Sequence, residues 1–259
     1  MLTFQVAAME ALTYNLLPLL HLAPFADFRF SRSTVFFTAS RENSTSCLYA
    51  QLQISESFFT ILSTNPNGPE ELRSSLQIDE FFFAISLTGT DNILLTALMP
   101  DEPFCTNLFF TNSIGHLKYN TILAMGPTPN TNVPEMDDGP FVAIDAEWFR
   151  DIATRLCAFN TRIWVTATVS KVTFSAILME FALLAEDKRC VIGGSNFGDG
   201  IKFPVTLIPL NFFIQASYLD NMVYFYMSSG GNTFVKFETG RWTNIVAFNP
   251  EDRWEVLPK

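Results

Sequence analysis

The sequence predicts an α+β protein made of two similar domains, in which short helices alternate with antiparallel strands. Helix-like segments recur along the 259 residues, and their starts are separated by 70, 67 and 63 residues. Alternating apolar and polar residues follow each segment, which is the pattern of half-buried strands. This recurrence predicts four helix–strand units. The helical segments are Met9–Leu22, Asp79–Leu87, Ala146–Phe159 and Pro209–Leu219.

The first helix is predicted from an apolar run, LTYNLLPLLHLAPFADF, at residues 12–28. No Lys or Arg precedes this run, so we do not expect a signal peptide. The run is also too short to span a bilayer, and Pro18 interrupts it. We therefore expect a buried helix, followed by strands in FRFSRSTVFF and SCLYAQLQI.

The other three helices each lead into a strand. In the third unit, EWFRDIATRL precedes a predicted hairpin formed by RIWVTATV and KVTFSAIL. The second and fourth units share a detail, because GTDNILLTALM (89–99) and LDNMVYFYM (219–227) both place Asp-Asn just before the strand. This shared detail favours an internal repeat.

A proline-rich segment separates the second unit from the third. The stretch GPTPNTNVPEMDDGP, residues 126–140, contains four Pro, two Gly and three acidic residues, without helical or strand periodicity. Such a composition is typical of a linker. We predict an N-terminal domain over residues 1–121, a connector over 122–138 and a C-terminal domain over 139–259.

The composition indicates a substantial core and an acidic surface. Hydrophobic residues make up 48% of the chain, including 27 Phe, and only 16% of residues are charged. The net charge is −10, so nucleic acid and anionic membranes repel the surface on average. Binding to DNA would therefore require a local reversal of sign.

The cysteines are widely spaced and form no CxxC pair. We interpret Cys47, Cys105, Cys157 and Cys190 as reduced thiols, which favours an intracellular compartment.

The sequence contains no recognisable catalytic or metal-binding pattern. His21 and His116 lack a ligand-type partner at i+3 or i+4, and no GxSxG, Walker or GxGxxG motif occurs. The glycine-rich stretch at 193–200 lacks the Lys-Ser/Thr of a phosphate loop, so we interpret it as a hairpin loop. The Asp pair in 136–138 is interpreted as solvated linker acids. We expect a non-catalytic protein without a metal or cofactor.

Three long segments carry a resemblance to a known family. They are NVPEMDDGPFVAIDAEWFRDIATRL (132–156), LNFFIQASYLDNMVYFYM (210–227) and SSGGNTFVKFETGRWTNIVAFNPED (228–252), and KVTFSA and GDGIKF lie between the first two. Together they resemble the sliding clamps of eukaryotes and archaea, the PCNA-like family (proliferating cell nuclear antigen and checkpoint clamps). In matching order, the long segments are similar to the connector exit and third helix, to the last clamp helix and the strand after it, and to the final strands and acidic tail. The first half matches in length and pattern.

The resemblance implies a DNA sliding clamp, a non-catalytic processivity and scaffold factor in DNA replication and repair. Three two-domain protomers would close head-to-tail into a pseudo-sixfold ring around double-stranded DNA, with antiparallel sheets outside and four short helices inside. The ring could be a homotrimer, or a heterotrimer such as the DNA-damage checkpoint clamp. Polymerases and repair proteins would dock through short peptides, and a clamp loader would place the ring on DNA. The implied location is nuclear, or otherwise intracellular at the site of replication.

The same resemblance assigns a partner-peptide pocket, formed by the connector and the C-terminal segment. A helical-turn peptide with aromatic anchors would fill such a pocket. Ordinary core packing is an equal alternative for Met125, and the tail proline is offset from the family pattern. The pocket residues are Leu123, Met125, Val133, Ala247, Phe248 and Pro250.

The predicted helices depart from the family in their charge. Clamp helices direct Lys and Arg toward the phosphates, but here the DNA-facing candidates are only Arg150 and Arg155. Five acidic residues in the same helices give a net charge of −3. At the family's lysine positions this chain has Thr13, Tyr14, Leu20, Phe83, Ser86 and Gln215.

Three explanations for this departure remain open. Strands could supply the positive lining, or basic partner chains could complete a heteromeric ring. Alternatively, the clamp fold could serve as a protein-interaction module that does not encircle DNA.

Overall fold

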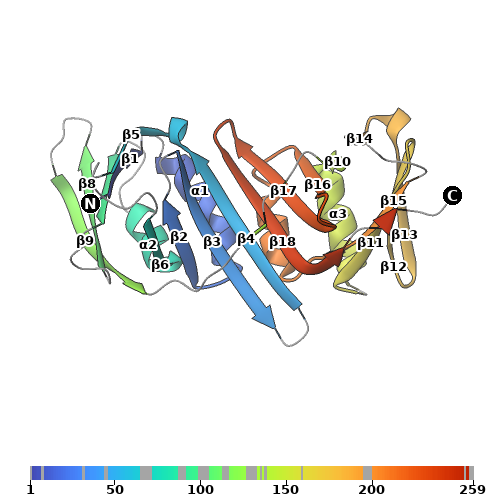
Figure 1. The fold of residues 1–259 in the computed structure, drawn as a ribbon, viewed down its shortest axis with the longest axis horizontal. Coiled ribbons are helices and arrows are strands. Elements are labelled where there is room, and N and C mark those ends of the chain that lie inside the picture. The colour runs from blue at the N-terminus through green and yellow to red at the C-terminus, as the bar shows by residue number, and fades with distance from the viewer. Residues whose placement is uncertain are drawn as a thin grey trace. The chain divides into compact units, whose positions relative to one another are not determined.

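The computed structural model gives an α+β protein in which four α-helices and antiparallel sheets occur within the described residues (Figure 1). The chain divides into two compact units. Unit 1 comprises Met1–Ser40, Gln51–Asn132 and Gly240–Asn244, and unit 2 comprises Arg41–Ala50, Val133–Thr239 and Ile245–Lys259. The structure describes residues 2–6, 9–30, 33–43, 46–64, 72–86, 92–98, 105–112, 117–126, 133–134, 136, 139–158, 160–194, 200–253 and 255–256.

The first half of the chain runs through strand, helix, three strands, a 3-10 helix, two strands, helix and three strands. The elements are β1 (Leu2–Val6), α1 (Met9–Leu20), β2 (Phe25–Phe30), β3 (Thr34–Asn43), β4 (Ser46–Ser55), η1 (Glu56–Phe58), β5 (Phe59–Thr64), β6 (Leu72–Gln77), α2 (Ile78–Ser86), β7 (Asn92–Leu98), β8 (Cys105–Asn112) and β9 (Leu117–Gly126). The tips of β3 and β4, within Arg41–Ala50, belong to unit 2.

The second half repeats this order, with η2 in the place of η1, and ends with one additional short strand. Its elements are β10 (Phe141–Asp145), α3 (Ala146–Cys157), β11 (Arg162–Ala167), β12 (Lys171–Ala176), β13 (Met179–Leu184), η2 (Ala185–Asp187), β14 (Cys190–Gly193), β15 (Ile201–Thr206), α4 (Leu210–Ala216), β16 (Met222–Met227), β17 (Asn232–Gly240), β18 (Thr243–Arg253) and β19 (Glu255–Val256).

The two halves also repeat their strand pairings, all of them antiparallel. β1 pairs with β5 and β7, and β10 pairs with β14 and β16. β2 lies between β3 and β6, and β11 lies between β12 and β15. In unit 1, β6 meets β9, and in unit 2, β15 meets β19, the short strand after β18. The predicted helix–strand repeat is therefore present, because one topology occurs twice.

The helices form where the sequence places apolar residues three and four apart. α3 buries Phe149, Ile152 and Leu156 on one face. Its first turn is capped by Asp145, whose side-chain Oδ1 accepts hydrogen bonds from the backbone N–H groups of Glu147 (2.8 Å) and Trp148 (3.3 Å). Such a cap satisfies donors that have no partner inside the helix.

α1, α3 and α4 end two or three residues earlier than the sequence pattern predicts. α1 ends at Leu20, where Pro18 already lies in the last turn and cannot donate a backbone hydrogen bond. α4 ends at Ala216, and the chain continues through turn hydrogen bonds, in which the N–H of Tyr218 donates to Gln215 and that of Leu219 donates to Ala216.

The core of unit 2 is a set of phenylalanine rings around Phe225 of β16. The Phe225 ring lies 5.8 Å from Phe174 of β12, 6.1 Å from Phe203 of β15 and 6.2 Å from Phe149 of α3, measured between centroids. These four side chains come from two separate sheets and a helix. One cluster of rings therefore holds the two sheets and the helix together through apolar burial and ring–ring contact.

A cluster of phenylalanine rings also occurs in unit 1. The Phe37 ring of β3 lies 5.2 Å from Phe28 of β2 and 5.7 Å from Phe81 of α2. α1 and α2 pack against each other, and α1 buries Leu12 and Leu16. The predicted buried first helix is thus present. None of the described helices combines the length and apolar character that a membrane crossing requires.

Some sequence predictions fall outside the described residues. These are His116, most of the predicted linker including the Asp pair, and the centre of the glycine-rich stretch at 193–200.

Candidate functional site

The residues predicted to form the peptide pocket are divided between the two units. Leu123 and Met125 lie in β9 of unit 1, where their backbones pair with Thr106 and Leu76. In unit 2, Val133 is half-buried outside any helix or strand. The other three lie on β18 of unit 2, where Ala247 and Phe248 are buried and Pro250 is half-buried.

An aromatic cluster surrounds Phe248 in unit 2. The Phe248 ring stacks on Phe234 at 5.2 Å and on Tyr49 at 6.3 Å, and only 5% of the residue is exposed. Val246 completes the buried part, and Met136 and Tyr226 pack against it. We call these six residues the Phe248 cluster. Because Phe248 is buried in this cluster, little of its ring is available to a peptide in the structure.

Most members of the Phe248 cluster were missed by the sequence analysis. The sequence pattern places Met136 in the linker and Tyr49 in an alternating strand in the other half of the chain. Periodicity identifies the buried face of a strand, but it does not say which distant strand covers that face.

The polar groups beside Tyr49 do not form an activated nucleophile. The Cys47 thiol lies 3.8 Å from Oε1 of Glu42, and burial raises the pKa of Cys47. A hydrogen bond with Cys47 and then burial raise the pKa of Tyr49 to about 12. Both groups therefore stay protonated near neutral pH, and a protonated thiol is a poor nucleophile.

Arg150 joins α3 to the end of α4. Its Nη1 donates a hydrogen bond of 2.9 Å to the backbone oxygen of Ser217, and its guanidinium lies 4.4 Å above the ring of Tyr218. A cation at a helix C-terminus interacts favourably with the helix dipole. The structure thus gives this predicted DNA-facing arginine a role in packing within unit 2.

Arg155 is more accessible but is paired with an acid. Its Nε lies 2.8 Å from Oδ1 of Asp151, and 59% of its side chain is exposed. A further cation, which the sequence analysis missed, lies beside α3, because Arg189 stands 4.6 Å over the ring of Trp148. Arg189 precedes β14, so no local sequence pattern groups it with the helix.

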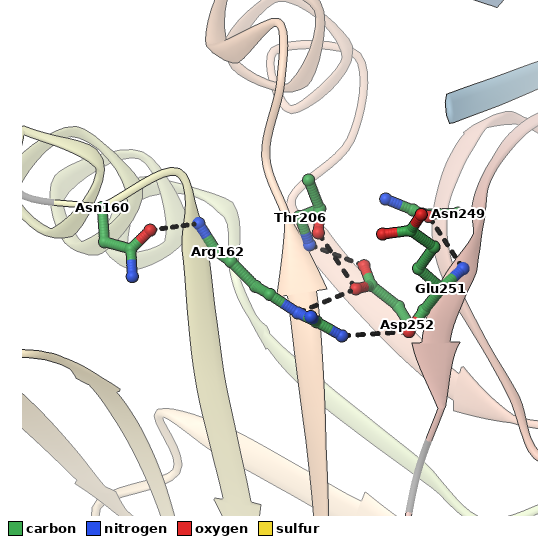
Figure 2. A network of polar contacts seen from close by, with 6 residues as sticks. All are labelled: Asn160, Arg162, Thr206, Asn249, Glu251 and Asp252. Carbon is green, nitrogen blue, oxygen red and sulfur yellow. Dashed lines mark hydrogen bonds and ion pairs between the residues drawn. The ribbon is translucent and has the colours of Figure 1, made fainter. Parts of the chain in front are cut away.

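A buried carboxylate, Asp252, links three strands of unit 2 (Figure 2). Its Oδ2 accepts a 2.6 Å hydrogen bond from the backbone N–H of Thr206, and its Oδ1 accepts one of 3.0 Å from the Thr206 hydroxyl. Arg162 Nε lies 3.5 Å from Oδ1, while Nη2 donates to the Glu251 backbone oxygen at 2.9 Å. The network fastens the end of β18 to β15 and β11.

Burial is the main influence on Asp252, and it raises the pKa of this carboxyl to about 6, although Thr206 and Arg162 act in the opposite direction. A carboxyl with such a pKa can be a general base when it faces a cleft. Here both oxygens accept hydrogen bonds inside the unit, and only 3% of the residue is exposed. We therefore assign Asp252 a structural role.

The chemistry of the described residues offers no metal site, because no group of three His, Cys, Asp or Glu side chains converges among them. Burial raises the pKa of Cys157 to about 11 and also raises that of Cys190, so these thiols are not activated. A comparison with protein-family models found no match to the chain, and a comparison with curated proteins found no significant relative.

Arg150 and Arg155 form a matched pair for a stability experiment. We expect Arg150→Ala to lower the unfolding free energy by about 1–2 kcal/mol, because the variant loses a charge-assisted hydrogen bond and a cation–π contact. Arg155→Ala should change it by less than about 0.5 kcal/mol, since an exposed i,i+4 ion pair contributes little. Urea denaturation of both variants measures the difference, and equal losses would contradict the assigned role of Arg150.

Asp252 should make stability depend on pH. Its pKa is raised from 3.8 to about 6 in the folded protein, so ionisation costs stability as pH rises through about 6, and the stability returns at lower pH. When the pH is lowered from 7.5 to 4.5, the unfolding free energy of the wild type should rise by about 2 kcal/mol more than that of Asp252→Asn. Urea titrations at several pH values test this, and a difference that is constant with pH would refute it.

Proposed function

We propose that the protein is a non-catalytic sliding-clamp scaffold that closes into a ring around double-stranded DNA and carries polymerases and repair proteins. The observation that supports this most directly is the duplicated topology, in which the same order of strands and helices, and the same strand pairings, occur twice in one chain. Each copy contributes a pair of packed helices, α1 with α2 and α3 with α4. Three such chains would supply six similar units for a pseudo-sixfold ring.

The exposed edge of β13 supports closure between copies. β13 is the terminal strand of the sheet β13-β12-β11-β15-β19, and an open, apolar edge is a template for pairing with another chain. The hairpin before it exposes 76% of Ile177 and 82% of Leu178, and Leu184 at its end is 38% exposed. These apolar groups favour burial against a second copy.

The internal repeat suggests which strand β13 would meet. By position in the repeat, β13 corresponds to β4, and β9 corresponds to β18. Within unit 2, Tyr49 of β4 already packs on Phe248 of β18. The equivalent contact between copies joins β13 of one chain to β9 of the next, which is a head-to-tail interface that can close into a trimer.

Partner proteins would dock at the Phe248 cluster through short peptides. The ring would encircle DNA, and its helices would make only weak direct contacts with the phosphates. The described helices carry two arginines and five carboxylates, and each arginine has a partner within unit 2. The ring could be homomeric, or it could be a checkpoint-type heterotrimer in which other chains supply cations.

A second candidate function is a clamp-fold interaction module that binds protein without encircling DNA. The acidic helices favour it, because phosphates gain no counterion-release energy from carboxylates. The exposed aromatic residues Tyr14, Phe83 and Tyr218 on or beside these helices favour it as well.

If the chain closes into a ring through β13, it should be a trimer in solution, and changes to β13 should dissociate it. Multi-angle light scattering of the purified chain should give three times the protomer mass. The double variant Ala182→Glu with Leu184→Glu places charges on the exposed edge strand and should give a monomer. Val169→Glu, which alters an exposed hairpin residue outside β13, should remain trimeric. A wild-type chain that is monomeric at micromolar concentration would rule out the homotrimer.

Topological binding separates the two candidate functions. With a clamp loader and ATP, the protein should be retained on a nicked circular plasmid during gel filtration and lost after a single cut linearises it. Arg155→Glu should lower this retention if the exposed side chain faces DNA. The β13 double variant, which is expected not to close, serves as the control. Equal retention on circular and linear DNA, or none on either, would favour the interaction module.

A further inference from the structure

An acidic and aromatic surface runs along the two helices of unit 1. On α1, Glu10, Tyr14 and Leu17 are spaced four and three residues apart, so they lie on one face of the helix. On α2, Asp79 and Glu80 precede Phe83 by one helical turn. Because α1 and α2 pack against each other, we treat these six residues as one surface, the α1–α2 stripe.

The stripe exposes more aromatic surface than the core requires. Phe83 is 64% exposed and Tyr14 is 55% exposed, whereas Leu12, Leu16 and Phe81 on the opposite helix faces are buried. The fold therefore already has its own apolar face on each helix, and the exposed rings are additional. Exposed rings of this size on adjacent helices are typical of an interaction surface.

The charge of the stripe has a single sign. Glu10, Asp79 and Glu80 are exposed, and neither helix contains Lys or Arg. Acids in the first turn of a helix are favourable to its dipole, which explains the acids by themselves. That effect does not explain why aromatic rings follow one turn later on the same exposed faces.

Charge decides which partner the stripe can accept. DNA phosphates and anionic lipid headgroups are repelled by the three exposed carboxylates of the stripe. A second copy of the chain that bound through its own stripe would bring the same carboxylates against them. The remaining complementary partner is a protein segment that is both basic and apolar.

We propose that the α1–α2 stripe binds a basic, apolar peptide segment of a partner protein. Arginine side chains of the segment stack over the rings of Tyr14 and Phe83 and pair with the neighbouring carboxylates, while its apolar side chains cover the rings and Leu17. The proposal rests on unit 1 alone and goes beyond the proposed clamp function. Its binding test is made without DNA, because these helices would line the hole of a ring that encircles DNA.

A pair of synthetic peptides tests the proposal with the full-length chain. One fluorescent 14-residue amphipathic peptide carries Leu on one face and Arg on the other, and its twin carries Glu in place of Arg. Fluorescence anisotropy should show binding of the Arg peptide only. Phe83→Ser and Tyr14→Ser should each weaken it about tenfold or more, the usual range for an aromatic interface residue. Glu80→Gln should weaken it less and reduce its dependence on salt.

A matched variant separates the stripe from general attraction to an acidic protein. Val169→Ser combined with Glu186→Gln removes one exposed apolar group and one exposed acid in unit 2, and it should bind the Arg peptide like the wild type. Circular dichroism verifies that each variant is folded. An equal loss in the matched variant, or full binding by Phe83→Ser, would overturn the proposal. Displacement of the peptide by duplex DNA that binds through Phe83 would overturn it in favour of a DNA surface.

Discussion

The structure of each unit depends on the burial of phenylalanine rings where strands and helices meet. In unit 2, Phe225 contacts rings from two sheets and from α3. Apolar burial is non-directional, so a single cluster of this kind can hold elements of different geometry. Strand pairing then sets the topology around the core, and the same pairings recur in unit 1 around Phe37.

Duplication has a direct functional consequence, because a repeated unit presents repeated edges. A contact that is satisfied within the chain at one copy is left open at the other, and β13 is such an open edge. Assembly into a closed ring would cover the open strand edge of every copy. The duplicated topology therefore supports the clamp proposal.

Two polar side chains of unit 2, Arg150 and Asp252, stabilise the fold through contacts inside the unit. Arg150 ties α3 to the end of α4, and Asp252 fastens β18 to β15 through Thr206. In unit 1, by contrast, Tyr14 and Phe83 are exposed on adjacent helices. The α1–α2 stripe is therefore acidic and aromatic, and these properties suit the proposed basic protein segment better than a phosphate backbone.

The helices, the alternating strands and the repeat could be predicted from the sequence alone, because they depend on local periodicity and on turn residues. It identified Arg150, Arg155 and Phe248 as residues of interest, but it could not say what each one contacts. Only the tertiary structure shows that the backbone oxygen of Ser217 accepts a hydrogen bond from Arg150, that Tyr49 stacks on Phe248 and that Met136 packs against the Phe248 cluster. Such contacts join residues far apart in the chain, and no local pattern encodes them. The exposure of Tyr14 and Phe83 was decided in the same way, because a helix pattern shows which faces differ but not what each face meets.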